Sequence, residues 1–567
     1  MWLERLRDMQ LIDASTYAMG CYMQQHDVSP SFWPSLLCAL SMQALKNGHT
    51  CLDCNQLLVQ FPALSKFPDL LTSIELNSLL SCRLIGHDTI QDKTLFTFSA
   101  PYLFTNKFLA LEQHLIESLA VRLNDKQLTP VDSIHINLAN LCLIKPMVLL
   151  SGGPGTGKTT VFAQAIPHWM LNFQQLYQRI PSIILCAPTG KAAARMSEAW
   201  NAQKAKLNCQ ELDSCLQDAM PNQAITIHRL LAIAPISKLA KYNKQNLLSV
   251  DLLIVDETSM LDLPLWVQLL DALPETAHLL LIGDAQQLPA IEAGQILGSL
   301  LEANSEHFFF QQLQFAHLHL THNFRQQSNP GLTALAKDCL NESAEMVADR
   351  IQNNDYAMVS WSDGHREQLN DLIKLAVTNY SALSRYETVV AALAAVRDFV
   401  ILTAVRDGSN GCVAINAEIA QRLNPSLNRY YHGQVLLITE NAKHLNLANG
   451  DIVMVWQLAD YSHKAHFIEN GRLQLLDLDI LPAHEPAYAL TIHKAQGSEY
   501  SHVCVVLPAK DSPILSKALL YTGITRAKNK LQLFATKTSL ISCLNNVAVR
   551  INGLKHLAEN LVQDKIQ

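Results

Sequence analysis

Short apolar runs alternate with longer amphipathic stretches over residues 116–330. Apolar strands of four to six residues, separated by helices, are typical of a parallel sheet that is buried on both faces. The pattern therefore predicts an α/β domain over this range. The expected strands are Met147–Leu150, Ser182–Ala187, Asp251–Val255, His278–Ile282 and Ala316–Leu320.

A second series of the same kind follows, and it predicts a second α/β domain over residues 331–424 and 481–567. Here too the apolar runs are short and helical patterns separate them, which favours a parallel sheet over an antiparallel one. The expected strands are Phe399–Ala404, Ala487–Thr491, Val503–Leu507 and Leu531–Ala535.

Two parts of the chain do not follow this alternation. Residues 425–480 contain short β-like segments broken by turn residues such as Gly433 and Asn449-Gly450-Asp451, which predict a small SH3-like β-barrel inserted in the second domain. Residues 1–115 are apolar and mixed and contain no phosphate-binding loop. We expect them to form an N-terminal accessory domain that docks a partner.

Length and composition are those of a folded protein with several domains. The chain has 567 residues, too many for one core, and 49% of them are hydrophobic while 16% are charged. No stretch approaches the ~20 apolar residues of a membrane span. The N-terminus lacks the pattern of a signal peptide. We therefore expect a cytoplasmic protein.

Cysteine usage and net charge exclude two further classes. The 13 cysteines are odd in number and scattered, which favours reduced thiols over a disulfide framework. Cys51 and Cys54 form one CxxC pair without a second pair at metal-site spacing, so we interpret them as half-buried structural cysteines. The net charge of −7 argues against a protein that coats DNA by bulk electrostatics, although a local channel can still bind a strand.

The segment Ser151–Thr160 fits the phosphate-loop pattern GxxxxGK[ST] and directly follows an expected strand. Glycines allow backbone N–H groups to curl around phosphate oxygens at the positive end of the next helix. We expect Lys158 to reach the β- and γ-phosphates of ATP, and Thr159 to hold Mg²⁺. The loop residues expected to bind ATP are Gly152, Gly153, Pro154, Gly155, Thr156, Gly157, Lys158, Thr159 and Thr160.

Two adjacent carboxylates stand at the end of another expected strand, in the segment LLIVDE. The carboxyl ends of parallel strands are where α/β proteins bind their ligands. Asp256 suits a role at Mg²⁺, directly or through water, and Glu257 suits the polarisation of the attacking water. An acidic pair after a strand often caps a helix, but about 100 residues after a phosphate loop it predicts the partner motif.

Three more polar residues complete the expected catalytic set. Gln287, in GDAQQLP, is placed to sense the γ-phosphate. Arg325, in THNFRQ, and Arg526, in TGITRAK, can stabilise charge that develops on the transferred phosphoryl group. Two arginines from different domains around one phosphate predict a cleft that closes on ATP, and closure converts hydrolysis into motion.

In order, these motifs resemble the motif series of superfamily 1 DNA helicases and, within that superfamily, the RecD type. The resemblance covers residues 116–567 and implies two RecA-like P-loop domains, 5′→3′ DNA helicase activity and ATPase activity that depends on single-stranded DNA. It also implies a heterotrimer with RecB-like and RecC-like subunits that processes double-strand breaks, with the nuclease in a partner. The matching segments are GGPGTGKTT, APTGKAA, IVDETSML, GDAQQLP, THNFRQ, TIHKAQGSE and YTGITRAK.

The resemblance also implies roles for residues outside the phosphate loop. Glu499 falls where a ribose contact is expected, and Phe324 falls where a ring stacks on adenine. His135 stands where the family usually has a glutamine that reads the adenine edge, and a histidine can make only part of that contact. The residues in motifs that line the single-strand channel are Thr189, His228, Thr491 and His493.

Two other functions remain open from the sequence. A stand-alone RecD-like helicase carries a longer N-terminal region than the ~115 residues here, which favours the subunit. A scaffold whose ATP site only locks an assembly would not need the full set of hydrolytic residues that this chain carries.

Overall fold

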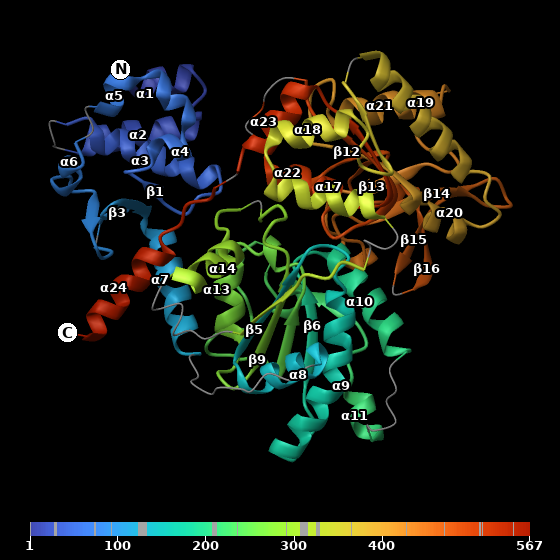
Figure 1. Ribbon diagram of the computed structural model, residues 1–567, viewed down its shortest axis with the longest axis horizontal. Coiled ribbons are helices and arrows are strands. Elements are labelled where there is room, and N and C mark those ends of the chain that lie inside the picture. Colours follow the sequence, from blue (N-terminus) through green and yellow to red (C-terminus); the bar gives the residue numbers. More distant parts are fainter. Residues whose placement is uncertain are drawn as a thin grey trace.

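The structure of the protein is a computed structural model, drawn in Figure 1. It describes residues 2–27, 31–72, 75–91, 93–122, 133–206, 213–234, 236–290, 292–306, 316–324, 329–364, 366–426, 428–469, 471–509, 512, 514–547 and 549–566. Arg325, one of the predicted catalytic residues, lies outside the described residues. Within these ranges no helix combines the length and the apolar content that a membrane crossing requires.

Six parallel strands form the first sheet, in the order β10-β5-β9-β8-β6-β7. Val148 and Leu150 of β5 pack with α8 and α9 in one core, while Met147 and Leu149 pack with α13 and α14 in another. The structure thus confirms a parallel sheet buried on both faces and adds a short edge strand, β7. The strands are β5 (Met147–Gly152), β6 (Ile183–Ala187), β7 (Ala224–Thr226), β8 (Leu252–Val255), β9 (His278–Gly283) and β10 (Ala316–Leu320). The helices are α8 (Ile134–Ile144), α9 (Lys158–Tyr177), α10 (Gly190–Lys204), α11 (Ser214–Ala219), α12 (Ile227–Leu230), η3 (Thr258–Met260), α13 (Leu263–Ala272) and α14 (Ile296–Glu306).

Five parallel strands form the second sheet, in the order β11-β20-β19-β12-β18. All four predicted apolar runs contribute a strand, and β11 is an additional edge strand whose residues Val359–Ser362 include Trp361 and two serines. The strands are β11 (Val359–Ser362), β12 (Phe399–Thr403), β18 (Ala489–Thr491), β19 (Tyr500–Val506) and β20 (Ala527–Phe534). The helices are α17 (Pro330–Asn341), α18 (Ala344–Gln352), α19 (Arg366–Leu383), α20 (Val389–Ala395), η4 (Val396–Asp398), α21 (Cys412–Leu423), η7 (His493–Ala495), α22 (Lys517–Ile524) and α23 (Lys537–Asn545).

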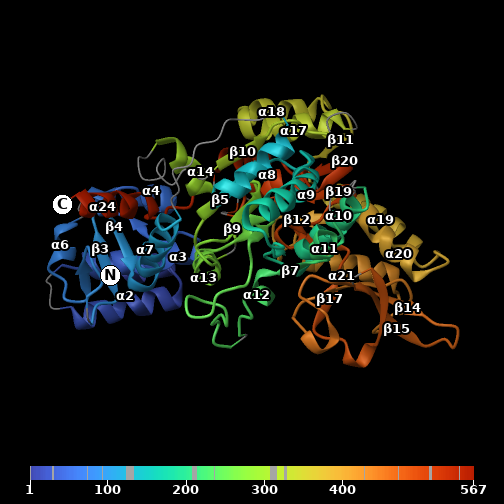
Figure 2. The ribbon, with the colours of Figure 1, turned by 90° about the horizontal axis from the view of Figure 1, so that it is seen from below.

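An antiparallel sheet of five strands lies between β12 and β18 in the sequence, in the order β16-β15-β14-β13-β17. It has its own small core, which includes Val453, Ala465 and Phe467. Figure 2 shows it beside α20 and α21. Its elements are β13 (Val435–Ile438), η5 (Lys443–Leu445), β14 (Ile452–Gln457), β15 (His463–Glu469), β16 (Arg472–Asp477), η6 (Leu478–Ile480) and β17 (His484–Pro486).

The N-terminal part of the chain has a core of its own around α3 and a four-stranded sheet of order β1-β4-β3-β2. Cys51 and Cys54 are buried here, more deeply than the half-buried pair that the sequence predicted, because apolar side chains enclose both. No group of metal-ligating residues occurs in the described parts of the chain. The elements are α1 (Trp2–Asp8), α2 (Ala14–His26), α3 (Trp33–Lys46), β1 (Leu52–Asp53), α4 (Leu57–Gln60), η1 (Pro62–Lys66), α5 (Pro68–Thr72), α6 (Asn77–Leu80), β2 (Ile85–His87), β3 (Phe96–Ser99), β4 (Tyr102–Thr105) and α7 (Asn106–Ala120).

The last helix, α24 (Leu554–Ile566), packs against α7 and not against the second sheet (Figure 1). Leu554 and Leu557 are buried in the core that also holds Leu115 and Leu119 of α7. The second α/β domain was predicted to extend to residue 567, but it does not include α24, because the apolar side chains of this helix pack against α7. Since α7 also packs on α13, it connects the N-terminal part to the first α/β domain.

Backbone hydrogen bonds fix the segment that leads to α24. The amide of Thr50 donates to the carbonyl of Ile551 at 3.0 Å, and the amide of Ile551 donates to Nδ1 of His49 at 3.0 Å. Arg550 donates to the carbonyl of Glu292 at 3.0 Å. The C-terminal segment therefore ties the N-terminal part to the loop after β9.

Candidate functional site

The phosphate loop connects the buried strand β5 to the N-terminus of α9. Two of its positions require glycine: Gly157 has a φ of +80°, and a Cβ on Gly152 would lie 2.9 Å from the carbonyl oxygen of Leu320. Thr156 Oγ1 donates to the carbonyl of Gly153 at 2.9 Å. The loop thus packs closely against the sheet and leads directly into the first turn of α9.

The ammonium group of Lys158 folds over this loop. Its Nζ donates to the carbonyl oxygen of Gly152 at 2.6 Å and to that of Gly153 at 3.0 Å. Thr159 and Thr160 follow in the first turn of α9, and Thr160 Oγ1 accepts a hydrogen bond from Gln203 at 3.3 Å. A positive charge and a helix N-terminus at one loop suit the phosphates of a nucleotide.

Asp256 and Glu257 stand at the carboxyl end of β8, as the sequence predicted. The amide of Glu257 donates to Oδ1 of Asp256 at 2.8 Å, and Glu257 itself has a left-handed φ of 53°. Burial, and then the charge of Glu257, raise the pKa of Asp256 to about 6. A divalent cation would relieve this crowding of negative charge, so the oxygen donors fit Mg²⁺.

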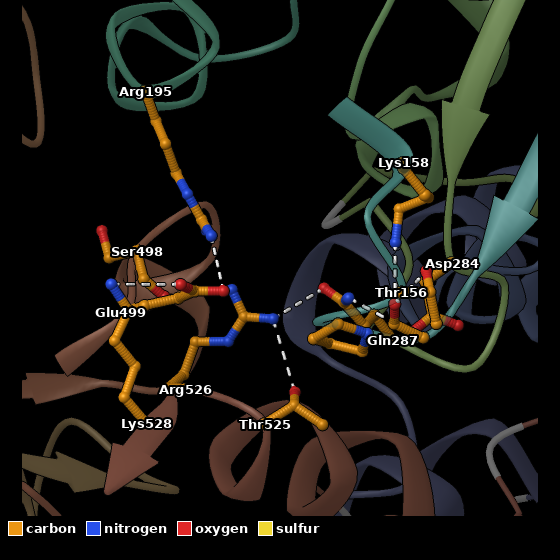
Figure 3. Close-up of polar contacts among 12 residues, drawn as sticks. Thr156, Lys158, Arg195, Asp284, Gln287, Ser498, Glu499, Thr525, Arg526 and Lys528 are labelled. Carbon is orange, nitrogen blue, oxygen red and sulfur yellow. Dashed lines mark hydrogen bonds and ion pairs between the residues drawn. The ribbon is translucent and has the colours of Figure 1, made fainter. Parts of the chain in front are cut away.

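Gln287 and Arg526 meet across the two α/β domains (Figure 3). Nη2 of Arg526 donates to Oε1 of Gln287 at 3.0 Å, and Nε2 of Gln287 donates to Oδ2 of Asp284 at 3.2 Å. Arg526 is only 2% exposed, and it also donates to the carbonyls of Thr522 at 3.1 Å and Ser498 at 3.2 Å. The structure therefore brings together two of the predicted catalytic residues from different domains.

Further cross-domain bonds surround this contact. The hydroxyl of Tyr521 donates to Oδ2 of Asp284 at 3.0 Å, and a Cβ on Gly153 would lie 3.2 Å from the same hydroxyl. The amide of Leu288 donates to Thr522 Oγ1 at 2.8 Å, and its carbonyl accepts from Gln496 at 2.9 Å. The two domains are thus joined beside the phosphate loop.

Phe324 and His135, the residues predicted to contact adenine, lie in different places. The amide of Phe324 donates to the carbonyl of Gly155 at 3.0 Å, and its ring carbon lies 3.1 Å from a Cβ built on Gly157. The ring of Phe324 is 61% exposed and therefore accessible at the loop. The ring of His135 instead stacks on that of His168. His168 is ten residues after Lys158 in α9, which places it about 15 Å further along the helix axis.

The four residues predicted to contact DNA lie at the carboxyl ends of strands, or just beyond them. Thr189 follows β6 and caps α10, since its Oγ1 accepts from the amide of Ala192 at 3.2 Å. His228 is in α12, which follows β7, the neighbour of β6. Thr491 ends β18 and His493 begins η7. Burial lowers the pKa of both histidines, so each favours the neutral form.

Three residues with contacts at this site were not among the predicted ones. Asp284 and Tyr521 stand in the quoted segments GDAQQLP and YTGITRAK, but only their neighbours were assigned roles. Arg195 of α10 lies four residues beyond the quoted glycine-lysine pair and forms an ion pair with Glu499 at 2.5 Å. The polar character of the segments was the available signal for the first two. Nothing in the sequence distinguished Arg195 from a surface arginine.

Two family models match separate parts of the chain. A family model described as an AAA domain matches residues 137–293, and one described as a UvrD-like helicase C-terminal domain matches residues 486–534. The RecBCD enzyme subunit RecD of Haemophilus influenzae is 31% identical over 477 residues, which are 73% of this chain and 71% of that protein. The chain belongs to the RecD family.

Other relatives extend the similarity along this RecD-family chain. The RecBCD enzyme subunit RecD of Mycobacterium tuberculosis is 28% identical over 92% of this chain and 90% of its own length. The ATP-dependent RecD2 DNA helicase of Deinococcus radiodurans is 29% identical over 68% of this chain and 46% of its own length. A solved structure of Pif1 helicase from Bacteroides with ADP-AlF3 and single-stranded DNA has 17% identity and a TM-score of 0.40, and covers 77% of this chain and 98% of its own.

Proposed function

We propose that this RecD-family chain is an ATP-dependent DNA helicase that moves 5′→3′ on single-stranded DNA. It works as a subunit of a RecBCD-type helicase–nuclease in the repair of double-strand breaks. The observation that supports a motor most directly is the bond between Gln287 and Arg526, because it joins the two domains beside the phosphate loop. Membership of the RecD family supports the polarity and the complex.

The proposed site binds ATP between the domains. Lys158 binds the β- and γ-phosphates, and Thr159 and Asp256 hold Mg²⁺, which supplies positive charge at the phosphates. Glu257 orients the attacking water. Gln287 and Arg526 respond to the terminal phosphate from opposite sides of the domain boundary. Phe324 stacks on the base, and Glu499 contacts the ribose.

The proposed domain division follows the sheets. Residues 116–330 form the first RecA-like domain, and residues 331–424 with 481–546 form the second. Residues 425–480, which include β13 to β16 of the antiparallel sheet, form an SH3-like β-barrel. Residues 1–115, with α24 packed against α7, form an accessory domain that docks a partner subunit. Thr189, His228, Thr491 and His493 contact the DNA strand.

We propose a cytoplasmic heterotrimer with RecB-like and RecC-like subunits, in which a partner carries the nuclease. A stand-alone RecD-like helicase is the alternative. The match to a RecD subunit extends over 92% of this chain, whereas the match to the RecD2 helicase extends over 68%. The additional matched part supports the subunit. A non-motor scaffold is disfavoured because the hydrolytic residues are all in the sequence.

The test is ATP hydrolysis and strand separation by the purified chain. We expect single-stranded oligonucleotides to stimulate the ATPase, and a duplex with a 5′ tail to be unwound faster than one with a 3′ tail. ATPase that ignores DNA would favour the scaffold, and preference for the 3′ tail would refute the polarity. Co-expression with RecB-like and RecC-like chains from the same host should yield a stable complex. A chain that remains alone would favour the stand-alone helicase.

A further inference from the structure

Arg195 of α10 reaches across the domain boundary to Glu499 (Figure 3). Its Nη2 lies 2.5 Å from Oε1 of Glu499, and Nζ of Lys528 lies 3.5 Å from the other carboxylate oxygen. The Glu499 side chain is only 9% exposed. The negative charge of a carboxylate that is so little exposed to solvent must be compensated by neighbouring groups. Arg195 and Lys528 both contribute to this compensation, and Arg195 belongs to the first domain.

The carboxylates of the ATP site also interact electrostatically with the guanidinium group of Arg195. Burial opposes its charge, but Glu499 and then Glu257 and Asp256 raise the pKa of Arg195 above its ordinary value. The charge of Arg195 thus interacts with the acidic pair of the first domain as well as with Glu499 of the second. Removal of its charge would leave the repulsion between these carboxylates less compensated, with Lys528 still beside Glu499 and Lys158 still acting on Asp256.

The helix α10, which carries Arg195, contacts the second domain. A Cβ on Gly497 would lie 3.4 Å from the side chain of Ala192. Three residues after Arg195 in α10, Glu198 pairs with Arg397 at 3.2 Å, but both of these side chains are more than half exposed. Exposed pairs contribute little, so the contact of Arg195 with the buried Glu499 is the stronger link.

We propose that Arg195 is a positioning residue that holds Glu499, and with it the second domain, against the Asp256–Glu257 pair when the ATP cleft closes. The inference rests on the proposed function, since it concerns closure around ATP. Arg195 does not itself touch the reacting phosphate in this scheme. It fixes the carboxylate that is expected to contact the ribose, and so it acts on nucleotide binding more than on the rate of hydrolysis.

Kinetics of Arg195→Ala, Arg195→Lys, Glu499→Gln and the double variant Arg195→Ala/Glu499→Gln test this role. We expect Arg195→Ala to raise the KM for ATP about three- to tenfold with less than about a twofold change in kcat, because it removes one charge-assisted contact. Arg195→Lys should recover part of the loss. The double variant should match the worse single variant. Effects that multiply, or a loss of kcat without a rise in KM, would overturn the proposal.

Arg397→Ala is the matched control, because it removes the exposed ion pair of the same helix. We expect it to stay within about twofold of wild type. A rise in KM as large as that of Arg195→Ala would assign the effect to α10 in general and overturn the role of Arg195.

Hydrogen–deuterium exchange without nucleotide separates this inference from the proposed function. In Arg195→Ala the backbone amides around Glu499 should exchange faster than in wild type, and in Arg397→Ala they should not. An ATPase that fails to respond to DNA would defeat the proposed function and leave this comparison valid. Unchanged exchange around Glu499 in Arg195→Ala would defeat the inference, whatever the ATPase does.

Discussion

Nη2 of Arg526 donates a hydrogen bond to Oε1 of Gln287 at 3.0 Å, although the two residues are 239 positions apart and belong to different domains. Gln287 is hydrogen-bonded in turn to Asp284, which directly follows β9, the neighbour of the strand that precedes the phosphate loop. The charge of Lys158 acts on Asp284 as well. Asp284 and Gln287 thus link Arg526 to the neighbourhood of the phosphate loop.

We expect Arg526→Ala to bind nucleotide within about threefold of wild type but to lose ATP turnover by about 100-fold or more. A positioned donor that meets developing charge contributes roughly that factor. Titration with a fluorescent ADP analogue and a steady-state ATPase assay with single-stranded DNA measure the two effects. A variant that turns over normally would reject the catalytic role of Arg526.

Lys158→Gln should reduce ATP hydrolysis to below about 1% of wild type and leave the fold intact, since the amide keeps the length of the side chain without its charge. In the structure the ammonium bonds only to loop carbonyls among the contacts described for it, so its loss should change the melting temperature by no more than about 2 °C. Circular dichroism melting accompanies the ATPase assay. Retained hydrolysis would contradict the assignment of the phosphate loop.

The sheets were predictable because burial on both faces leaves an uninterrupted apolar run, as in Leu252–Val255. The edge strands β7 and β11 were not predicted, because an edge strand needs fewer apolar residues and Ala224–Thr226 is short. The helix α24 was placed in the wrong domain, since an amphipathic pattern shows that a helix has a buried face but not which element covers it.

In the candidate site, too, some residues were predictable from local sequence patterns and others were not. Residues whose role depends on local geometry, such as Lys158 after a glycine loop, follow from spacing alone. Tyr521 and Arg195 act through contacts between residues more than 200 positions apart, and no local pattern encodes such a contact. His135 was expected at the base from the family resemblance, which did not predict its contact with His168.

Tyr521→Phe isolates one cross-domain hydrogen bond. It removes the hydroxyl that donates to Asp284 at 3.0 Å and keeps the ring in its buried place. Because a buried carboxylate then loses a donor, we expect a loss of about 1–3 kcal/mol in the free energy of unfolding. We also expect kcat to fall about tenfold. Urea unfolding and the DNA-stimulated ATPase measure these effects. The exposed Tyr461→Phe serves as control, and equal behaviour of the two variants would exclude a role for the Tyr521 hydroxyl.

Glu112 of α7 is a buried carboxyl group between the N-terminal part and the C-terminal segment. Thr50 Oγ1 donates to its Oε1, and the amide of Gly553 donates to its Oε2 at 2.9 Å. Burial nevertheless raises the pKa of Glu112 from 4.5 to about 8, against the opposing effect of these two bonds. The folded protein therefore holds this proton at a pH where the unfolded chain has already released it.

The sign of the pH effect follows from the two pKa values. Between pH 4.5 and about 8 the folded state binds more protons at Glu112 than the unfolded state, so the free energy of unfolding falls as pH rises, by up to roughly 1.4 kcal/mol per pH unit. His49 has the opposite effect, since burial lowers its pKa from 6.5 to about 4, and that contribution levels off only above the unfolded-state pKa of 6.5. Over the window from pH 6.5 to 8, the difference between wild type and a Glu112 variant isolates Glu112, because His49 contributes equally to both proteins.

In that window we expect Glu112→Gln to remove much of the decline in stability that wild type shows. The amide oxygen still accepts from Gly553, and the amide nitrogen can donate to Thr50, so both contacts survive without a titrating group. Urea unfolding at pH 6.5 and pH 8 measures the difference for each protein. At pH 6.5 the two should differ by less than at pH 8, where glutamine should be the more stable. Parallel curves for wild type and variant would show that Glu112 does not titrate there and that the junction of α7 with Gly553 tolerates a carboxylate.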